Sequence, residues 1–375
     1  MAEAQGIAGG RLAWPDVAKG IGIVLMYYGH VLACLPAGAA IGTPGPGLEE
    51  MRFIYAFHMP LFFLLAGVFF RPAADPAARR RELARRRLVP VAFFSLLLLP
   101  LWLASTLRHG TAGWTEFGPM LAAYLRGHPT LDWVTWFLVC LFVCECMALS
   151  VLPRLKSPLV QGLAGMSSIW AGVLACNHAD TTAAVFGVEV QAWFIYEALV
   201  ALGFYIIGHA LAPALARLSV RKTAAVGTSV LGFGLALLSY RLNESIHQLP
   251  VMMAAGRHGD PLMFIIAALG GSAGVIGLAM ACAPVRWLVR VGRHSLPLLG
   301  LSGFFFHFAN PRLEVLWPSS GSAVPLTLHT LIVTAASLAV ALPAAERLMS
   351  WVPQLLGGGE RLPPTQDGLR SIAAE

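Results

Sequence analysis

Long apolar runs, separated by short polar loops, repeat along the whole chain. Ten of these runs approach the length of about 20 residues that a helix needs to cross a bilayer. They cover approximately residues 15–36, 53–70, 88–107, 133–152, 158–176, 189–211, 223–240, 261–283, 294–310 and 324–343. This pattern predicts an all-α, polytopic integral membrane protein of about ten transmembrane helices.

The pattern divides the chain into three regions. Residues 1–14 are rich in small residues and are predicted to form a cytoplasmic leader. Residues 15–345 form the predicted membrane domain, and residues 346–375 a cytoplasmic tail that is expected to be disordered because it is polar and rich in Gly and Pro. The first run loosely fits a signal peptide, but Asp16 and His30 within it favour an uncleaved membrane helix.

The composition agrees with a membrane protein. Of the 375 residues, 57% are hydrophobic and only 12% are charged, against about 25% charged in soluble domains. The six cysteines lie in or beside apolar runs and form no C-x-x-C pair, so neither a disulfide framework nor a structural zinc site is expected.

The basic residues predict how the chain is oriented. The formal net charge is +7, and the surplus gathers in short loops between apolar runs, which favours a membrane topology signal over nucleic-acid binding. With ten spans, 20 of the 26 Lys and Arg residues fall on the side of the N-terminus and 6 on the opposite side. This asymmetry predicts that both termini are cytoplasmic.

The first apolar run carries three ionisable residues. Asp16 and Lys19 are three positions apart and share a helix face near its start. His30 lies 11 residues after Lys19, which places it roughly 16 Å further along the helix axis. Ionisable groups inside a span are costly and usually functional, so this helix is the first candidate for the active site.

Four histidines are predicted to share one layer in the outer third of the membrane: His30, His58, His307 and His329. A neutral imidazole can act as a general base near neutral pH. We expect this role for His30. For His58 and His307, a functional role and ordinary burial both remain open, and for His329 ordinary burial is the simpler interpretation.

The loop after the second span holds the densest positive charge. Its arginines can attract anionic lipid, or they can bind a phosphate-bearing cytoplasmic donor through bidentate hydrogen bonds. Arg85, Arg86 and Arg87 adjoin the third span and are expected to line a pocket better than Arg79 to Arg81. Glu145 and Glu197 are intramembrane carboxylates whose partners the sequence leaves open. No motif indicates a metal site.

Two stretches resemble the integral-membrane acyltransferase 3 family. The first is Asp16-Val-Ala-Lys-Gly-Ile-Gly-Ile with Gly29-His30, and the second is the run from Phe57-His58-Met59-Pro60 to Gly67. The Trp136-Phe137-Leu138 stretch, and Gly292 to Leu296 followed by His307, also fit, so the similarity covers about residues 14–345. Lys19 stands where the family usually has arginine, as in the branch that resembles fucose 4-O-acetylases.

The resemblance implies a membrane-bound O-acyltransferase of the bacterial inner membrane. It would move an acyl group, acetyl from the co-substrate acetyl-CoA, to a hydroxyl of an envelope or exported carbohydrate or glycolipid. It implies His30 as general base, with Lys19 and His58 as further catalytic residues. No cofactor, metal or nucleic-acid partner is expected.

The remaining site expectations concern the two substrates. Arg85, Arg86 and Arg87 are expected to bind the donor. An acceptor pocket is expected around Asp16, Trp136, Glu197 and His307. The alternative function is a proton-coupled transporter or flippase for a glycolipid, because buried histidines and carboxylates also suit proton relays.

Overall fold

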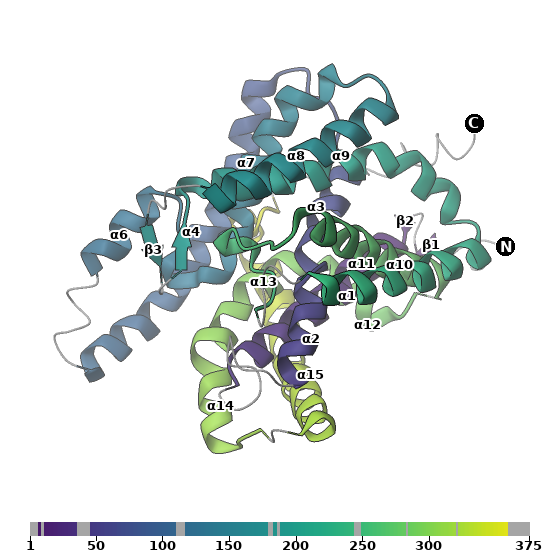
Figure 1. The fold of residues 1–375 in the computed structure, drawn as a ribbon. Helices are drawn as coiled ribbons and strands as arrows, with labels where there is room; N and C mark the ends of the chain where they lie inside the picture. Colours follow the sequence, from purple (N-terminus) through teal and green to yellow (C-terminus); the bar gives the residue numbers. More distant parts are fainter. Residues whose placement is uncertain are drawn as a thin grey trace.

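The computed structural model describes residues 7–8, 11–35, 46–109, 117–178, 183–185, 188–243, 249–282, 284–319 and 322–358. Helices dominate this part of the chain (Figure 1). Among the described residues, the strands form two short antiparallel ribbons, β1 (Ile7–Ala8) with β2 (Arg11–Leu12) and β3 (Ala183–Val185) with β4 (Val188–Val190). The predicted all-α class is therefore confirmed.

Eight helical segments of the described chain are long and apolar enough to cross a membrane. They are Pro46–Val68, Pro76–Arg108, Gly118–Arg154, Pro158–His178, Ala192–Leu218, Lys222–Leu242, Pro261–Ala281 and Ala323–Trp351. The other two predicted spans coincide with α1 (Trp14–Ala33) and α13 (Ser295–Phe304). The chain is a multi-pass membrane protein, and the total of ten spans stays a prediction.

The predicted second span is two helices. Its first part is α2 (Pro46–Tyr55), and α3 (His58–Val68) follows after a break at residues 56–57. Pro60 falls in the first turn of α3, where a missing N–H costs no intrahelical hydrogen bond. The break places His58 at the first residue of a helix that starts inside the molecule.

The basic loop is also helical. Asp75 accepts hydrogen bonds from the backbone N–H groups of Ala77 and Ala78, and Pro76 begins α4 (Pro76–His109) directly after it. The arginines from Arg79 to Arg87 therefore lie on the first turns of a 34-residue helix.

The rest of the chain continues in short and long helices. The middle part contains α6 (Phe117–Leu125), η2 (Thr130–Thr135), α7 (Trp136–Val151), η3 (Leu152–Arg154), α8 (Pro158–His178), η4 (Ala192–Phe194), α9 (Ile195–Leu218), α10 (Lys222–Leu242) and η6 (Met253–Ala255). The last part contains α11 (Pro261–Ala281), α12 (Arg286–Arg293), α13, the π-turn η7 (Phe305–Ala309), α14 (Asn310–Leu316), α15 (Ala323–Trp351) and η8 (Pro353–Leu356). Helical structure thus reaches beyond residue 345, into the predicted tail.

The core lies around α1, α3, α7 and α9. Large side chains such as Tyr27, Phe63 and Phe204 are fully buried there. In α8 and α10, only 22% and 33% of the most apolar stretch is buried, against 67% in α7, α9 and α11. The exposed apolar faces of α8 and α10 are therefore the surfaces expected to meet lipid.

Helices α1 and α12 approach each other very closely. A Cβ atom built on Gly292 would lie 1.8 Å from the backbone oxygen of Asp16, and one built on Gly20 would lie 2.3 Å from the backbone oxygen of Leu288. Arg293 adds an ion pair, with its Nε 3.3 Å from Oδ2 of Asp16. Small residues let the two backbones meet, as in other membrane helix pairs, and this contact positions α13 beside α1.

Candidate active site

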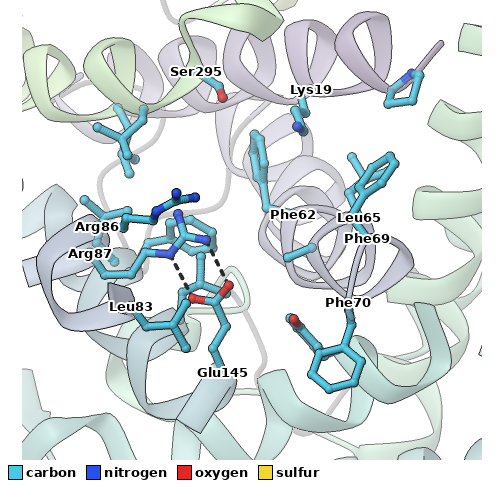
Figure 2. A pocket seen from close by; sticks show the side chains of 18 of the residues that line it. Lys19, Phe62, Leu65, Phe69, Phe70, Leu83, Arg86, Arg87, Glu145 and Ser295 are labelled. Atoms are coloured by element: carbon cyan, nitrogen blue, oxygen red, sulfur yellow. Dashed lines mark hydrogen bonds and ion pairs between the residues drawn. The ribbon is translucent and has the colours of Figure 1, made fainter. Parts of the chain in front are cut away.

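A cavity of about 540 Å³ opens among α1, α3, α4, α7, α9 and α13. This volume lies within the range of about 300–1,000 Å³ that is usual for small-molecule sites. Figure 2 shows Lys19 and Ser295 on one side, Arg86, Arg87 and Glu145 on a second side, and Phe62, Leu65 and Phe69 on a third. Six helices, from the N-terminal to the C-terminal part of the sequence, therefore build one site.

Positive charge dominates the polar part of the cavity. Five cationic side chains line it against a single carboxylate, that of Glu145; the cations are Lys19, Arg71, Arg79, Arg86 and Arg87. Lys19 also packs over the ring of Phe69, with 5.8 Å from Nζ to the ring centroid. Such a set suits the phosphates of a nucleotide-bearing ligand.

Arg87 is held by a bidentate ion pair with Glu145. Its Nε and Nη2 donate to the two carboxylate oxygens of Glu145 at 2.8 Å each (Figure 2). A guanidinium has five N–H donors, so three remain for other partners. The pair joins α4 to α7 and fixes the direction of the Arg87 head group.

The three arginines that the sequence predicts for the donor separate in the structure. Arg86 and Arg87 line the cavity, whereas Arg85 is exposed and does not line it. Arg79 does line it, although the sequence ranked it lower. The reason is that α4 begins before Arg79, so Arg79, Leu83 and Arg86 follow one another on a single helix face.

The end of the cavity that lies deepest in the protein, towards His30, is apolar, and we call it the inner end. Its α1 lining runs from Pro15 and Lys19 through Ile23 to Met26. On the opposite wall, the lining runs from Phe69, just after α3, back through Phe62 to Met59 on α3. Beyond Met26 and Met59 come His30 and His58, neither of which lines the cavity. The cavity thus leads along α1 and α3 towards two of the predicted histidines and stops short of them.

Three of the four predicted histidines gather in one cluster. His58 and His307 are close enough to His30 to interact with it electrostatically. The ring of Phe306 lies 5.1 Å from His30 and 5.0 Å from His307, centroid to centroid. The π-turn at residues 305–309 thus carries both Phe306 and His307. We call His30, His58 and His307 the histidine cluster.

The hydrogen bonds of the cluster leave ring nitrogens available as bases. His58 Nδ1 lies 3.1 Å from the backbone oxygen of Ile54. A carbonyl can only accept, so Nδ1 carries the proton and Nε2 keeps a lone pair in the neutral ring. His30 Nδ1 is buried and has no hydrogen-bond partner among the described residues. A neutral imidazole without a partner can accept a proton from a bound hydroxyl.

The other predicted residues lie elsewhere. Asp16 pairs with Arg293, and Trp136 is buried at the start of α7 against the ring of Phe194 at 5.7 Å. Glu197 is buried at the start of α9 near Gly256, and none of these three predicted residues lines the cavity. His329 Nε2 lies 3.5 Å from a carboxylate oxygen of Glu314.

Asp132 is a buried carboxylate that the sequence did not single out. It is fully buried, and neither carboxylate oxygen has a hydrogen-bond partner in the described structure. A Cβ built on Gly303 would lie 1.9 Å from its Oδ1, and the neighbouring Leu131 accepts a 2.7 Å hydrogen bond from Trp102, whose ring lies 5.6 Å from His307. Asp132 stands at the end of a polar loop in the sequence, so its burial could not be predicted from the hydropathy pattern.

No group of three or more His, Cys, Asp or Glu side chains that could hold a metal is found among the described residues. The candidate site consists of the cationic cavity, its apolar inner end and the histidine cluster beyond that end.

Comparison with known proteins supplies the family. A family model described as an acyltransferase domain, acyltransferase 3, matches residues 12–346, which is most of the chain. No curated protein and no solved structure matches. The chain belongs to this acyltransferase family and is a multi-pass membrane acyltransferase.

Proposed function

We propose that this enzyme transfers an acetyl group from acetyl-CoA to a hydroxyl of an envelope or exported carbohydrate or glycolipid in the bacterial inner membrane, with His30 as general base. The observation that carries the proposal is the cavity itself: its cationic side chains suit the phosphates of CoA, and its apolar end points along α1 to His30.

The donor binds with its phosphates among the cationic side chains at the cytoplasmic end. Lys19 lies on α1, and Arg86 and Arg87 face it from α4. Because α1 rises about 1.5 Å per residue, His30 stands roughly 16 Å beyond Lys19. The pantetheine arm of CoA is a flexible chain that extends from the phosphates, and in this arrangement it follows α1 towards the histidine cluster.

The reaction needs one base and two bond changes. His30 takes the proton of the acceptor hydroxyl as its oxygen attacks the thioester carbonyl. The new C–O bond forms, the C–S bond breaks, and the proton passes from His30 to the leaving sulfur. His58, with Nε2 as acceptor, orients the acceptor hydroxyl or the His30 ring.

The acceptor side is proposed from the family resemblance. Lys19 in place of the family's usual arginine suggests the branch similar to fucose 4-O-acetylases, and hence a sugar hydroxyl. Lysine keeps the charge but lacks the bidentate fork of arginine. Trp136, Glu197, Asp16 and His307 remain proposed acceptor contacts, of which His307 belongs to the histidine cluster.

The test measures the acyl content of exported glycans by mass in a deletion strain complemented with wild type, His30→Ala or His178→Ala. His178 is exposed on α8 and serves as the matched control, with membrane levels checked for each variant. We expect deletion and His30→Ala to lose the same acyl mass and His178→Ala to retain it. Retention by His30→Ala would exclude His30 as the base.

A gradient experiment separates the enzyme from a proton-coupled carrier. Family membership favours the enzyme, which should consume labelled acetyl-CoA in membranes whose proton gradient has been collapsed. Activity that stops with the gradient and needs no acyl donor would favour the carrier instead.

A further inference from the structure

We propose that Met26 and Met59 close the inner end of the donor cavity and restrict the donor to small, uncharged acyl groups. The inference rests on the proposed function and adds to it the class of acyl group. It concerns the part of the cavity between the cationic side chains and the histidine cluster.

The first argument is the alignment of side chains on α1. Lys19, Ile23 and Met26 line the cavity at helical spacings of four and three residues, and His30 follows Met26 after four more, on the same face. One turn of helix, roughly 6 Å, therefore separates Met26 from His30. A thioester that reaches the end of the cavity places its acyl group against Met26.

The second argument is the register of α3 beside α1. Lys19 contacts the ring of Phe69, a Cβ on Gly22 would lie 2.7 Å from the ring of Phe62, and a Cβ on Gly29 would lie 2.5 Å from the ring of Tyr55. The α2–α3 segment therefore runs antiparallel to α1. Met59 lies on the opposite wall of the cavity, at the same level as Met26.

The third argument is the chemistry of the inner end. The lining side chains at the His30 end of α1 and at the starts of α3 and α7 are apolar: Met26, Met59, Phe62, Phe137 and Leu138. The rings of Phe62 and Phe137 are 5.9 Å apart. Glu145 lies seven residues after Leu138 on α7, roughly 10 Å nearer the cationic side chains.

An acyl group with its own carboxylate would have no partner there. Burying an unpaired carboxylate in an apolar site is strongly unfavourable, so succinyl and malonyl groups are disfavoured. Met26 and Met59 are both buried, at 2% and 8% exposure, and are the last lining residues of α1 and α3 before the histidine cluster, so a long acyl chain would have to displace them. Methionine is flexible, so the pair can move to let a small acyl group meet the acceptor hydroxyl.

The experiment compares donors. Membranes of the deletion strain that contain wild type, Met26→Ala, Met59→Ala or Met166→Ala receive acetyl-, hexanoyl- or succinyl-CoA labelled in the acyl group, and label in the glycan fraction is counted. Met166 lies on the exposed face of α8 and is the matched control. A milder variant, Met26→Val, is included in case the alanine variants do not accumulate.

We expect wild type and Met166→Ala to transfer acetyl at least roughly tenfold faster than either other group, since a few methylenes or a charge in an apolar pocket have effects of this size. The Met26 and Met59 variants should raise the hexanoyl-to-acetyl ratio roughly tenfold and still reject succinyl. Equal transfer of succinyl by wild type, or an unchanged ratio in all the variants, would overturn the proposal. No transfer of any acyl group by wild type would instead contradict the proposed function.

Discussion

Glu145 and Arg87 form a bidentate ion pair in the cavity wall. The Glu145 side chain is 8% exposed and the Arg87 side chain 24%, so both charges are largely removed from water. A buried charge that loses its partner is destabilising, whereas an exposed pair contributes little. Loss of one partner from an Arg–Glu pair is therefore expected to lower the free energy of unfolding more when the pair is buried than when it is exposed.

We predict that Glu145→Gln lowers the apparent Tm of the purified enzyme. Loss of the carboxylate leaves the Arg87 charge partly buried without its partner, at a cost of roughly 2 kcal/mol after allowance for the partial exposure. With an unfolding entropy of about 2.1 cal/mol/K per residue, this corresponds to roughly 2–3 °C for a chain of 375 residues in a thermal-shift assay in detergent.

The matched control is Glu346→Gln. Glu346 forms a similar bidentate pair with Arg290, but there the arginine side chain is 56% exposed. We expect its effect on Tm to be close to zero. Equal shifts for the two variants would show that the Arg87 pair contributes no more than a surface pair.

At the residue scale, the sequence predicted what is local and missed what is distant. The shared helix of Lys19 and His30 follows from a spacing of 11 residues. The partner of Glu145 could not be read, because Arg87 lies 58 positions away and only the packing of α4 on α7 joins them. The cavity position of Arg79 could not be predicted, because the polar residues before the apolar run give no sign that α4 already begins at Pro76.

The contact between α1 and α12 shows how elements are arranged around the site. Gly292 lies against the backbone of Asp16, and the ion pair of Asp16 with Arg293 closes the same contact. Since α13 follows α12 directly, this contact also sets the position of Ser295 and Leu296 in the cavity wall.

We predict that Gly292→Val strongly reduces the amount of folded enzyme in the membrane. The new Cβ would lie 1.8 Å from a backbone oxygen, which no side-chain movement can relieve. The measurement is the protein level after detergent extraction, together with the monodisperse peak in size-exclusion chromatography.

Gly234→Val on α10 is the control for this prediction. A Cβ built there meets nothing within 4 Å, so only the small difference in helix propensity applies. If both variants accumulate equally, the close approach of α1 and α12 does not limit folding.

At the element scale, hydropathy located nearly every membrane helix but not the interruptions. The division of the second span at residues 56–57 depends on a proline at a tolerated helix position, and the π-turn at 305–309 depends on packing. The arginine-rich stretch is polar and therefore looked like a loop, whereas its capping by Asp75 makes it the start of α4.

At the scale of the whole molecule, the charge asymmetry and the cavity point to the same side. The loops predicted to be cytoplasmic hold most Lys and Arg residues, and the cationic part of the cavity is formed where α1 begins and α3 ends. A donor made in the cytoplasm would therefore meet the cavity directly.

We predict that Cys282 is labelled from the cytoplasm only. It is exposed and follows α11, at a predicted inner boundary. A membrane-impermeant maleimide should label wild type in inverted vesicles, and Cys282→Ser should remove this label. In intact spheroplasts, where Cys34 and Cys176 lie nearer the outer face, Cys282→Ser should leave the labelling unchanged.

The opposite face is tested with Arg257→Cys in the Cys282→Ser background. Arg257 is exposed in a predicted outer loop, so label is expected in intact spheroplasts. Labelling of both positions from one side would contradict the ten-span topology.

Because Lys19 and His30 stand on one continuous helix, the separation between them is fixed and α1 acts as a ruler for the donor. Neighbouring helices can shift without changing this separation of roughly 16 Å. A short acyl donor such as acetyl phosphate cannot touch both ends at once, whereas a long thioester carrier can. The enzyme should therefore distinguish its donor by length as well as by charge, and acetyl phosphate should not replace acetyl-CoA even at high concentration.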